Sequence, residues 1–321
     1  MPVSQGFDAA LAGVLGLLIG SFLNVVIYRM PVMMYRDWLT DAVANLMSSK
    51  DQPSLWSLVF GPKTTTPKDL EAAADKAAPA VENLPRFNLA LPASRCGACG
   101  HKIRLHENIP VVSYIFLRGR CASCKTSISP RYPLVEAVTG ALFALCGWRF
   151  GLTPTGALWT AFAAFLICQF LIDFDTQLLP DPLNYMLLWL GLIGAAMGWT
   201  GVTLSSAIWG AVFGYLSLWL VYHAYRLIMG KEGMGYGDFK LLAALGVWFG
   251  ADYLIAIILV SSLVGAVIGS ALRVIGRLKQ WDIPIAFGPF LAGAGVVCLV
   301  IGPELVRQWV PFAFPLGTLL R

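Results

Sequence analysis

The sequence predicts an all-α polytopic membrane protein with about eight transmembrane helices and a small cytoplasmic zinc-ribbon-like domain inserted after the first helix. Hydrophobic residues make up 57% of the chain and charged residues only 13%, whereas soluble domains carry about 25% charged residues. The apolar residues form long continuous runs, which favours helices over a transmembrane barrel. The one sizeable polar region contains two closely spaced pairs of cysteines.

Eight apolar segments follow one another along the chain, and most are long enough to cross about 30 Å of hydrocarbon as helices. The segment at 239–250 is the exception, because helix of that length reaches only about 18 Å. We expect it to tilt, to borrow flanking residues or to dip in and return, and we count it as a span. The segments are 7–28, 133–150, 156–172, 183–200, 204–229, 239–250, 253–276 and 285–302.

The basic residues predict the orientation, because the cytoplasmic loops of membrane proteins carry an excess of Lys and Arg. Fourteen of the 23 basic residues fall between Arg29 and Arg131. With eight spans, six more lie on the same side, whereas seven spans would place the basic cluster at 273–279 outside. We therefore expect an external N-terminus and a cytoplasmic polar region. The six are Arg226, Lys231, Lys240, Arg273, Arg277 and Lys279, and the three on the opposite side are Arg149, Arg307 and Arg321.

The first segment is expected to remain as a helix and not to be a cleaved signal peptide. No basic residue precedes it, Asp8 lies within it and Arg29 follows it, whereas a signal peptide has its positive region first. The cytoplasmic faces account for the net charge of +5, so we expect no nucleic-acid partner. Any apolar face could meet the lipid bilayer or another copy, so the sequence predicts no particular oligomeric state.

The polar region separates into two parts. Low hydrophobicity and scattered prolines at 40–90 indicate a linker or a mobile insertion, with loop-like runs at 48–53 and 64–67 and a short helix favoured at 69–78. The part that follows carries the cysteines. The expected domains are a first transmembrane helix at 1–30, a cytoplasmic linker or insertion at 31–93, a cytoplasmic zinc-binding domain with four cysteines at 94–131 and a transmembrane core at 132–321.

Two C-x-x-C pairs are separated by 21 residues. Paired turns of this kind deliver four thiolates to a tetrahedral zinc ion, so we predict one structural zinc per chain. Two disulfides, a redox pair or unliganded thiols are the alternatives, and a reducing cytoplasm disfavours the disulfides. With four thiolates at hand, His101 and His106 are expected at the surface. The four predicted ligands are Cys96, Cys99, Cys121 and Cys124.

Two acidic residues lie at boundaries of apolar segments. Asp238 follows a glycine-rich turn and precedes Lys240, and Asp173 ends another apolar run. An acid at the edge of a hydrocarbon-buried helix is costly and by default suggests a function. Two close carboxylates can share one proton and perform acid–base hydrolysis; the alternative is a structural polar contact. We expect Asp175 and Asp181 to be ordinary interfacial residues.

Several motifs occur in order along the chain. They are Gly20-Ser-Phe-Leu-Asn-Val-Val-Ile-Tyr-Arg29, the paired cysteines, Glu107-Asn-Ile-Pro-Val-Val-Ser-Tyr114, Arg131-Tyr-Pro-Leu-Val-Glu136, Asp173-x6-Pro180-Asp181 and Gly235-Tyr-Gly-Asp238-Phe-Lys240. With this set the chain resembles the type IV prepilin peptidases, the bifunctional leader peptidase/N-methyltransferases of bacterial plasma membranes. The last motif is the G-x-G-D signature of that family, shared with the wider intramembrane aspartyl proteases.

The resemblance implies a membrane-embedded aspartyl endopeptidase with Asp173 and Asp238 as its catalytic residues, supported by the loop residues Gly235, Gly237 and Lys240. It implies that the short basic leader of prepilins and pseudopilins is removed just after a glycine. It also implies methylation of the new N-terminal amine with S-adenosylmethionine. The expected location is the bacterial plasma (inner) membrane, with a multi-pass chain whose active site faces the cytoplasm.

The site of the methyl donor is less defined. No G-x-G-x-x-G follows a strand, so we expect no Rossmann domain; the region 94–136, with Glu107 and Glu136, is the candidate contributor, and a structural role for either acid stays open. The alternative function is a transporter or channel with intramembrane acids and a regulatory zinc domain, but the acids gather at one face. A zinc metalloprotease is disfavoured because no H-E-x-x-H motif is present.

Overall fold

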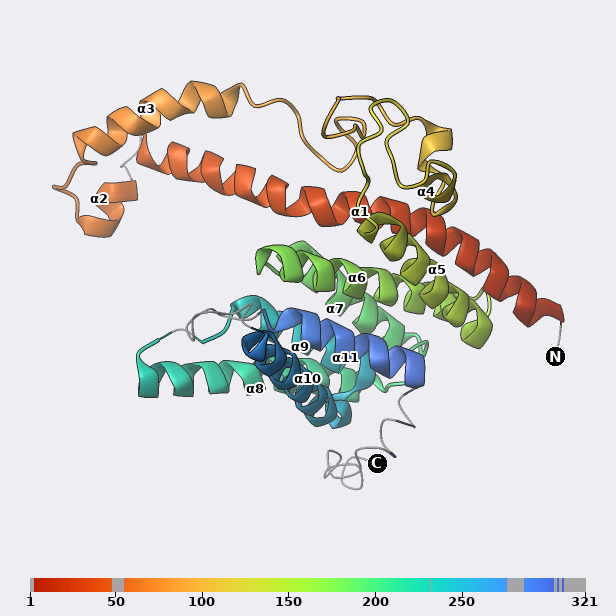
Figure 1. The fold of residues 1–321 in the computed structure, drawn as a ribbon. Helices are drawn as coiled ribbons and strands as arrows, with labels where there is room; N and C mark the ends of the chain where they lie inside the picture. The colour runs from red at the N-terminus through yellow and green to blue at the C-terminus, as the bar shows by residue number, and fades with distance from the viewer. Residues whose placement is uncertain are drawn as a thin grey trace. The chain divides into compact units, whose positions relative to one another are not determined.

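The structure, a computed structural model, describes residues 3–47, 55–231, 233–275, 286–302, 305 and 308. Within these ranges the regular elements are helices, and the strand-like contacts are isolated bridges such as the one between Arg120 and Ser127 (Figure 1). The predicted helical class is confirmed for this part of the chain. The loop predicted at 48–53 and four of the basic residues used for orientation lie outside the described residues; these four are Arg277, Lys279, Arg307 and Arg321.

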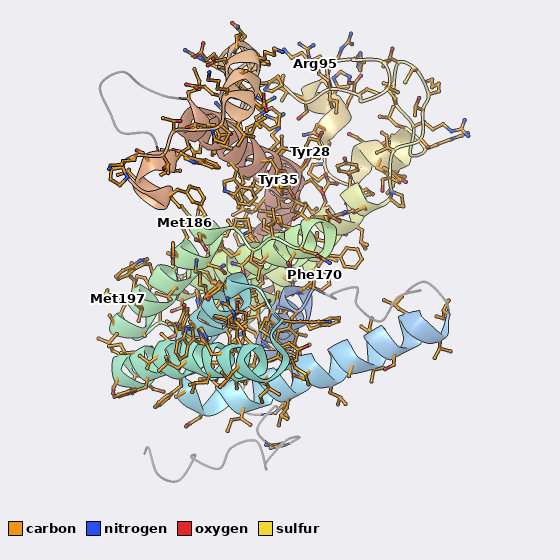
Figure 2. The ribbon with its side chains drawn as sticks, turned by 90° about the vertical axis from the view of Figure 1, so that its left-hand side faces the viewer. Tyr28, Tyr35, Arg95, Phe170, Met186 and Met197 are labelled. Carbon is orange, nitrogen blue, oxygen red and sulfur yellow. The ribbon has the colours of Figure 1, made fainter. Side chains whose placement is uncertain are left out.

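The chain divides into two compact units, residues 28–95 and the remainder. Figure 2 marks Tyr28 and Arg95, the first and last residues of the smaller unit. Helix α1, Val3–Leu46, contributes to both units and continues through Pro31. It is therefore longer than the first apolar segment predicted from the sequence.

Contacts within the smaller unit hold the polar half of α1. The guanidinium of Arg29 donates hydrogen bonds to the carbonyl oxygens of Asn88 (2.8 Å) and Pro92 (2.6 Å). Further along, Val43 packs against α3. These contacts explain why helix continues beyond the apolar run, which hydropathy alone does not reveal. The other helices of this unit are α2, Leu55–Phe60, and α3, Lys68–Glu82, which contains the short helix expected at 69–78.

The larger unit is a helical bundle in which α9 is enclosed by α7, α8, α10 and α11. Every residue of α9 from Leu241 to Phe249 is buried. A helix of 14 residues is short for a membrane span, but α9 is surrounded by protein and not by lipid. The helices of this unit besides α1 are α4 (Val112–Phe116), α5 (Arg131–Phe150), α6 (Pro154–Thr176), α7 (Asp181–Ala196), α8 (Leu204–Met229), α9 (Tyr236–Phe249), α10 (Leu254–Val274) and α11 (Gly288–Ile301).

Four helical segments of the described chain are long and apolar enough to cross a membrane. Helix α11 is apolar but shorter, and α7 and α9 also fall short of a full span of about 20 residues. The membrane class is thus supported by length and composition, while the count of eight spans stays a prediction. The four segments are Ser4–Leu46, Pro154–Thr176, Leu204–Met229 and Ala251–Leu272.

Gly210 and Gly246 form a tight contact between α8 and α9. A Cβ atom added to either glycine would collide with the backbone carbonyl group of the other, and small residues are what allow helix backbones in membranes to approach this closely. Gly246→Ala should therefore lower the thermal unfolding temperature in detergent, because overpacking costs about 1–3 kcal/mol.

Gly6→Ala is the matched control, because a Cβ at Gly6 in α1 meets nothing within 4 Å. It should leave the unfolding temperature unchanged or slightly higher, because alanine favours a helix more than glycine does. An equal effect of the two substitutions would show that the α8–α9 contact is not as tight as the structure has it.

Candidate functional site

The two predicted catalytic aspartates line one cleft. Asp173 lies in the last turn of α6 and Asp238 in the first turn of α9, and their exposed fractions are only 4% and 7%. The cavity volume is about 440 Å³. The fold thus joins two acids that lie far apart in the sequence. The other residues that line the cleft are Gln177, Leu179, Gly233, Met234, Gly235, Gly237, Ala286 and Phe287.

A tight turn ends α6 directly after Asp173. Gln177 adopts the left-handed conformation (φ 56°), and its N–H donates a hydrogen bond to the carbonyl oxygen of Asp173 (2.9 Å). A left-handed residue commonly closes a helix in this way. The turn directs the chain through Leu179, which lines the cleft, to Pro180 at the start of α7.

The glycines of the loop before α9 have different roles. A Cβ at Gly237 would lie 2.7 Å from Cβ of Leu179, so this glycine permits the close approach of the two cleft-lining loops. A Cβ at Gly235 would have Oδ2 of Asp238 as its nearest neighbour, at 3.8 Å, so the residues that the structure describes leave room for a side chain at this position. Neither glycine has a positive φ. Close packing at Gly237 and access to the cleft at Gly235 are therefore what these positions provide.

Sequence reasoning missed Gly288, the first residue of α11. A Cβ atom there would lie 2.5 Å from Oδ2 of Asp173 and 2.9 Å from Cδ1 of Leu179. Only glycine fits against the carboxyl group at this distance. The Gly288-Pro289 pair at the start of an apolar helix was the available signal, but nothing in the sequence connects it to α6.

The remaining predicted residues around the cleft form ion pairs. Nζ of Lys240 lies 2.6 Å from Oδ1 of Asp181, and it lies 5.4 Å from the centre of the Tyr185 ring. The guanidinium of Arg131 donates two hydrogen bonds to Asp175, at 2.8 and 2.6 Å. None of these residues lines the cleft. Both acids therefore lie outside the cleft, and their interfacial position stays a prediction.

The four predicted metal ligands come together. Their sulfur atoms all lie within 4.8 Å of one another, and Sγ of Cys96 is 3.8 Å from Sγ of Cys124. A tetrahedral zinc site with Zn–S bonds of about 2.3 Å has sulfur–sulfur edges of about 3.8 Å. All seven cysteines are unpaired, so the disulfide alternative does not fit the structure. The four cysteines are positioned to bind one metal ion.

Two similar turns bring these thiols together. In each turn the fourth residue after the first cysteine donates its N–H to that cysteine's carbonyl oxygen, and that residue has a positive φ: Gly100 in the first turn and Lys125 in the second. The hydroxyl group of Thr126, 3.2 Å from Sγ of Cys124, together with the backbone N–H of Thr126 and the neighbouring thiol of Cys99, lowers the pKa of the Cys124 thiol to about 6. A thiolate is the form that binds a metal ion.

Two glutamates near the cysteine cluster, Glu107 and Glu136, accept hydrogen bonds from backbone N–H groups. His101 lies 3.0 Å from Glu107, outside the cysteine cluster; the backbone N–H of Arg104 and this imidazole lower the pKa of Glu107. Glu136 is buried and accepts a hydrogen bond of 2.7 Å from the N–H of Val111. Val111 has a φ of 60°, which is strained for a β-branched residue. Both glutamates thus have structural contacts.

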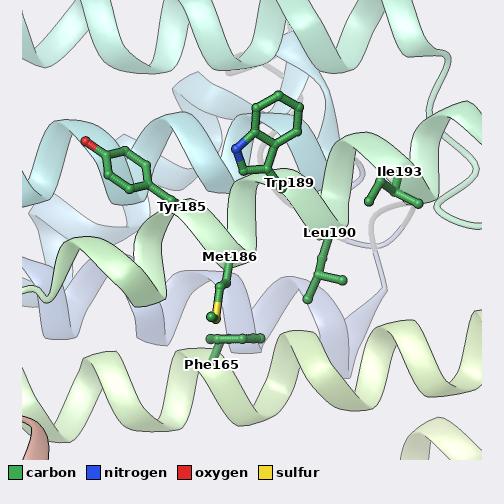
Figure 3. A pocket seen from close by; sticks show the side chains of 6 residues that line it. All are labelled: Phe165, Tyr185, Met186, Trp189, Leu190 and Ile193. Atoms are coloured by element: carbon green, nitrogen blue, oxygen red, sulfur yellow. The ribbon is translucent and has the colours of Figure 1, made fainter.

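A second cavity, of about 380 Å³, lies between α6 and α7 (Figure 3). In Figure 3 the side chain of Met186 reaches from α7 toward the ring of Phe165 on α6. The lining is apolar and offers no carboxyl, thiol or imidazole group. Its lining residues are Phe165, Tyr185, Met186, Trp189, Leu190 and Ile193.

Comparison with known proteins agrees with these features. Residues 14–150 match the bacterial peptidase A24 N-terminal domain and residues 160–270 match the type IV leader peptidase family. Proteins named prepilin leader peptidase/N-methyltransferase from Stutzerimonas stutzeri and Pseudomonas aeruginosa are each 46% identical, covering 94% and 93% of this chain and 93% and 92% of their own. The protein of that name from Neisseria gonorrhoeae is 46% identical over 96% of this chain and 95% of its own.

No solved structure matches this chain. The four apolar helices and the matched family together indicate an inner-membrane protein. The two family matches and the near-complete coverage by these relatives lead to one conclusion: the chain belongs to the type IV leader peptidase family.

Proposed function

We propose that this protein is a membrane-embedded aspartyl endopeptidase that removes the short basic leader of type IV prepilins and pseudopilins. It then methylates the new N-terminal amine with S-adenosylmethionine. The observation that carries the proposal is the pair of buried carboxyl groups, Asp173 and Asp238, in one cleft at the ends of apolar helices. The names of the relatives support both activities.

The proposed mechanism uses the two carboxyl groups as a unit. Two acids at short range cannot both ionise, so they hold one proton between them. The ionised carboxylate removes a proton from water, and the water oxygen adds to the carbonyl carbon of the scissile bond. The protonated carboxyl group donates its proton to the carbonyl oxygen, which gives a gem-diol. As the C–N bond breaks, the leaving amine takes the proton that came from water, and a hydroxyl group of the gem-diol returns its proton to the other carboxylate. The pair titrates together, so base and acid are not assigned individually.

The proposed arrangement has eight spans, an external N-terminus and the cleft at the cytoplasmic face. In this arrangement the first helix anchors a cytoplasmic insertion at 31–93 and a four-cysteine domain at 94–131, and the core at 132–321 carries the cleft. A prepilin is an apolar helix with a basic leader, and its scissile bond lies at the cytoplasmic interface. Carboxyl groups at the same depth reach that bond without moving it into hydrocarbon, where unpaired backbone groups are costly.

The four cysteines are proposed to hold one structural zinc ion. Four protein ligands leave no open coordination position, so this ion stabilises the fold of its domain and takes no part in hydrolysis. The sulfur–sulfur distance of 3.8 Å between Cys96 and Cys124 supports zinc. The methyl donor supplies the methyl group for the second activity, and a methyl-transfer assay on pre-cleaved pilin tests that activity independently.

Asp173→Asn and Asp238→Asn should each abolish leader removal while the protein stays folded. General acid–base catalysis typically contributes about 10²–10⁴-fold, so a loss of at least that size is expected. The measurement is cleavage of a purified prepilin in detergent. Asp175→Asn is the matched control, because Asp175 pairs with Arg131 and lies outside the cleft, and it should retain cleavage. Normal cleavage by either of the first two variants would discard the pair.

Gly288→Ala should reduce the kcat of cleavage at least tenfold, because the added methyl group would displace the Asp173 carboxyl group. Gly293→Ala adds the same methyl group to the same helix, where the nearest atom, Cε2 of Phe170, would lie at an ordinary 3.8 Å. This control should cleave prepilin normally. Equal activity of both variants would contradict the close contact between α11 and Asp173.

Elemental analysis of the purified protein should find about one zinc ion per chain. Cys96→Ser should lose it, whereas Cys298→Ser should keep it, because Cys298 is a single cysteine buried in α11. An unchanged zinc content in the Cys96 variant would rule out the proposed ligand set.

A further inference from the structure

Two buried amide side chains have no hydrogen-bond partner among the residues that the structure describes. Gln169 on α6 is 0% exposed and Asn184 on α7 is 1% exposed. Both polar atoms of each side chain, Oε1 and Nε2 of Gln169 and Oδ1 and Nδ2 of Asn184, are unpartnered. Neither residue lines the aspartate cleft or belongs to a motif used above.

Each amide lies about one helical turn further into its helix than an acidic residue, Asp173 on α6 and Asp181 on α7. Gln169 precedes Asp173 by four residues and therefore shares its face of α6, about 6 Å along the axis. Asn184 follows Asp181 by three residues on α7. Asp181 pairs with Lys240, two residues after Asp238 in α9. Helix α7 packs against both α6 and α9. Phe170, the neighbour of Gln169, is marked in Figure 2.

Apolar side chains flank both amides along their own helices. The neighbours one turn away, Leu166 and Ile172 on α6 and Leu187 on α7, are fully buried. Buried polar atoms are almost always hydrogen-bonded to protein or to ordered water. A side-chain amide carries two donors and an acceptor oxygen, and a buried water molecule needs two to four polar partners of this kind. Each of these buried amides therefore has the chemistry of a water site and not that of a metal or anion site.

We propose that Gln169 and Asn184 hold water beneath the two aspartates and act as positioning residues for the water used in hydrolysis. The inference rests on the proposed function. Each cleavage consumes one water molecule, while the substrate's helix and leader would cover the open side of the cleft. Water held behind the carboxyl groups stays within reach once the substrate has bound. One helical turn is the span that a single bridging water covers between two polar groups.

The test replaces each amide with an apolar side chain of similar size, in Gln169→Met and Asn184→Leu. Each variant should stay folded, because an unpartnered polar group is replaced by one that needs no partner. The kcat of prepilin cleavage should fall at least tenfold with KM unchanged. Ser261→Ala is the control, because that buried hydroxyl group bonds to the carbonyl oxygen of Ile257 in its own helix (2.6 Å). It should leave kcat unchanged.

Other kinetic outcomes would overturn the inference. A raised KM with normal kcat would mean that the amides bind substrate instead of water. Normal kcat and KM in both variants would mean that the amides serve the fold alone.

A second measurement does not depend on activity. Hydroxyl radicals generated by X-rays in water enriched in oxygen-18 label buried side chains that lie beside ordered water. Leu166 and Ile172 should be labelled in the wild-type protein and should lose the label in the Gln169 variant. Absence of label in the wild type would overturn the water site even if the enzyme cleaves prepilin. Labelling without any prepilin cleavage would instead reject the proposed function and leave the water site in place.

Discussion

The burial of two carboxyl groups in one cleft is the constraint on which the rest of the structure depends. An isolated carboxylate is expensive to bury, so such groups persist only where the surrounding structure holds them. Here Asp173 ends one helix and Asp238 begins another. The turn at Gln177, the loop before α9 and the start of α11 all converge on this point.

Close backbone packing defines the cleft. Gly237 lets its loop meet Leu179, and Gly288 lets α11 begin against the Asp173 carboxyl group. Deeper in the bundle, Gly210 and Gly246 bring α8 against α9. Shape and chemistry are therefore linked: the glycines set how near the helices come, and the helices set where the two acids lie. The two neighbouring acids, Asp175 and Asp181, form ion pairs with Arg131 and Lys240 outside the cleft.

The sequence carried enough to predict the helical class, the two aspartates and the four cysteines, because each leaves a local mark: apolar runs, acids at their edges and repeated C-x-x-C turns. It did not predict Gly288 or the amides of Gln169 and Asn184, since their significance arises only when α6, α7 and α11 pack together. The continuation of α1 to Leu46 was missed for the same reason. Its polar half is held by contacts such as those from Arg29 to the segment near Pro92, and hydropathy does not report such contacts.

The most direct test of the central claim measures whether the two acidic positions face each other across one cleft. The variant that combines Asp173→Cys with Asp238→Cys would be treated with a short thiol crosslinker in detergent, and the linked peptides would be identified by mass spectrometry. Rapid crosslinking of this pair is expected, with little crosslinking when Asp175→Cys replaces Asp173→Cys. Equal crosslinking of both pairs, or none in either, would show that the two aspartates do not face each other across one cleft.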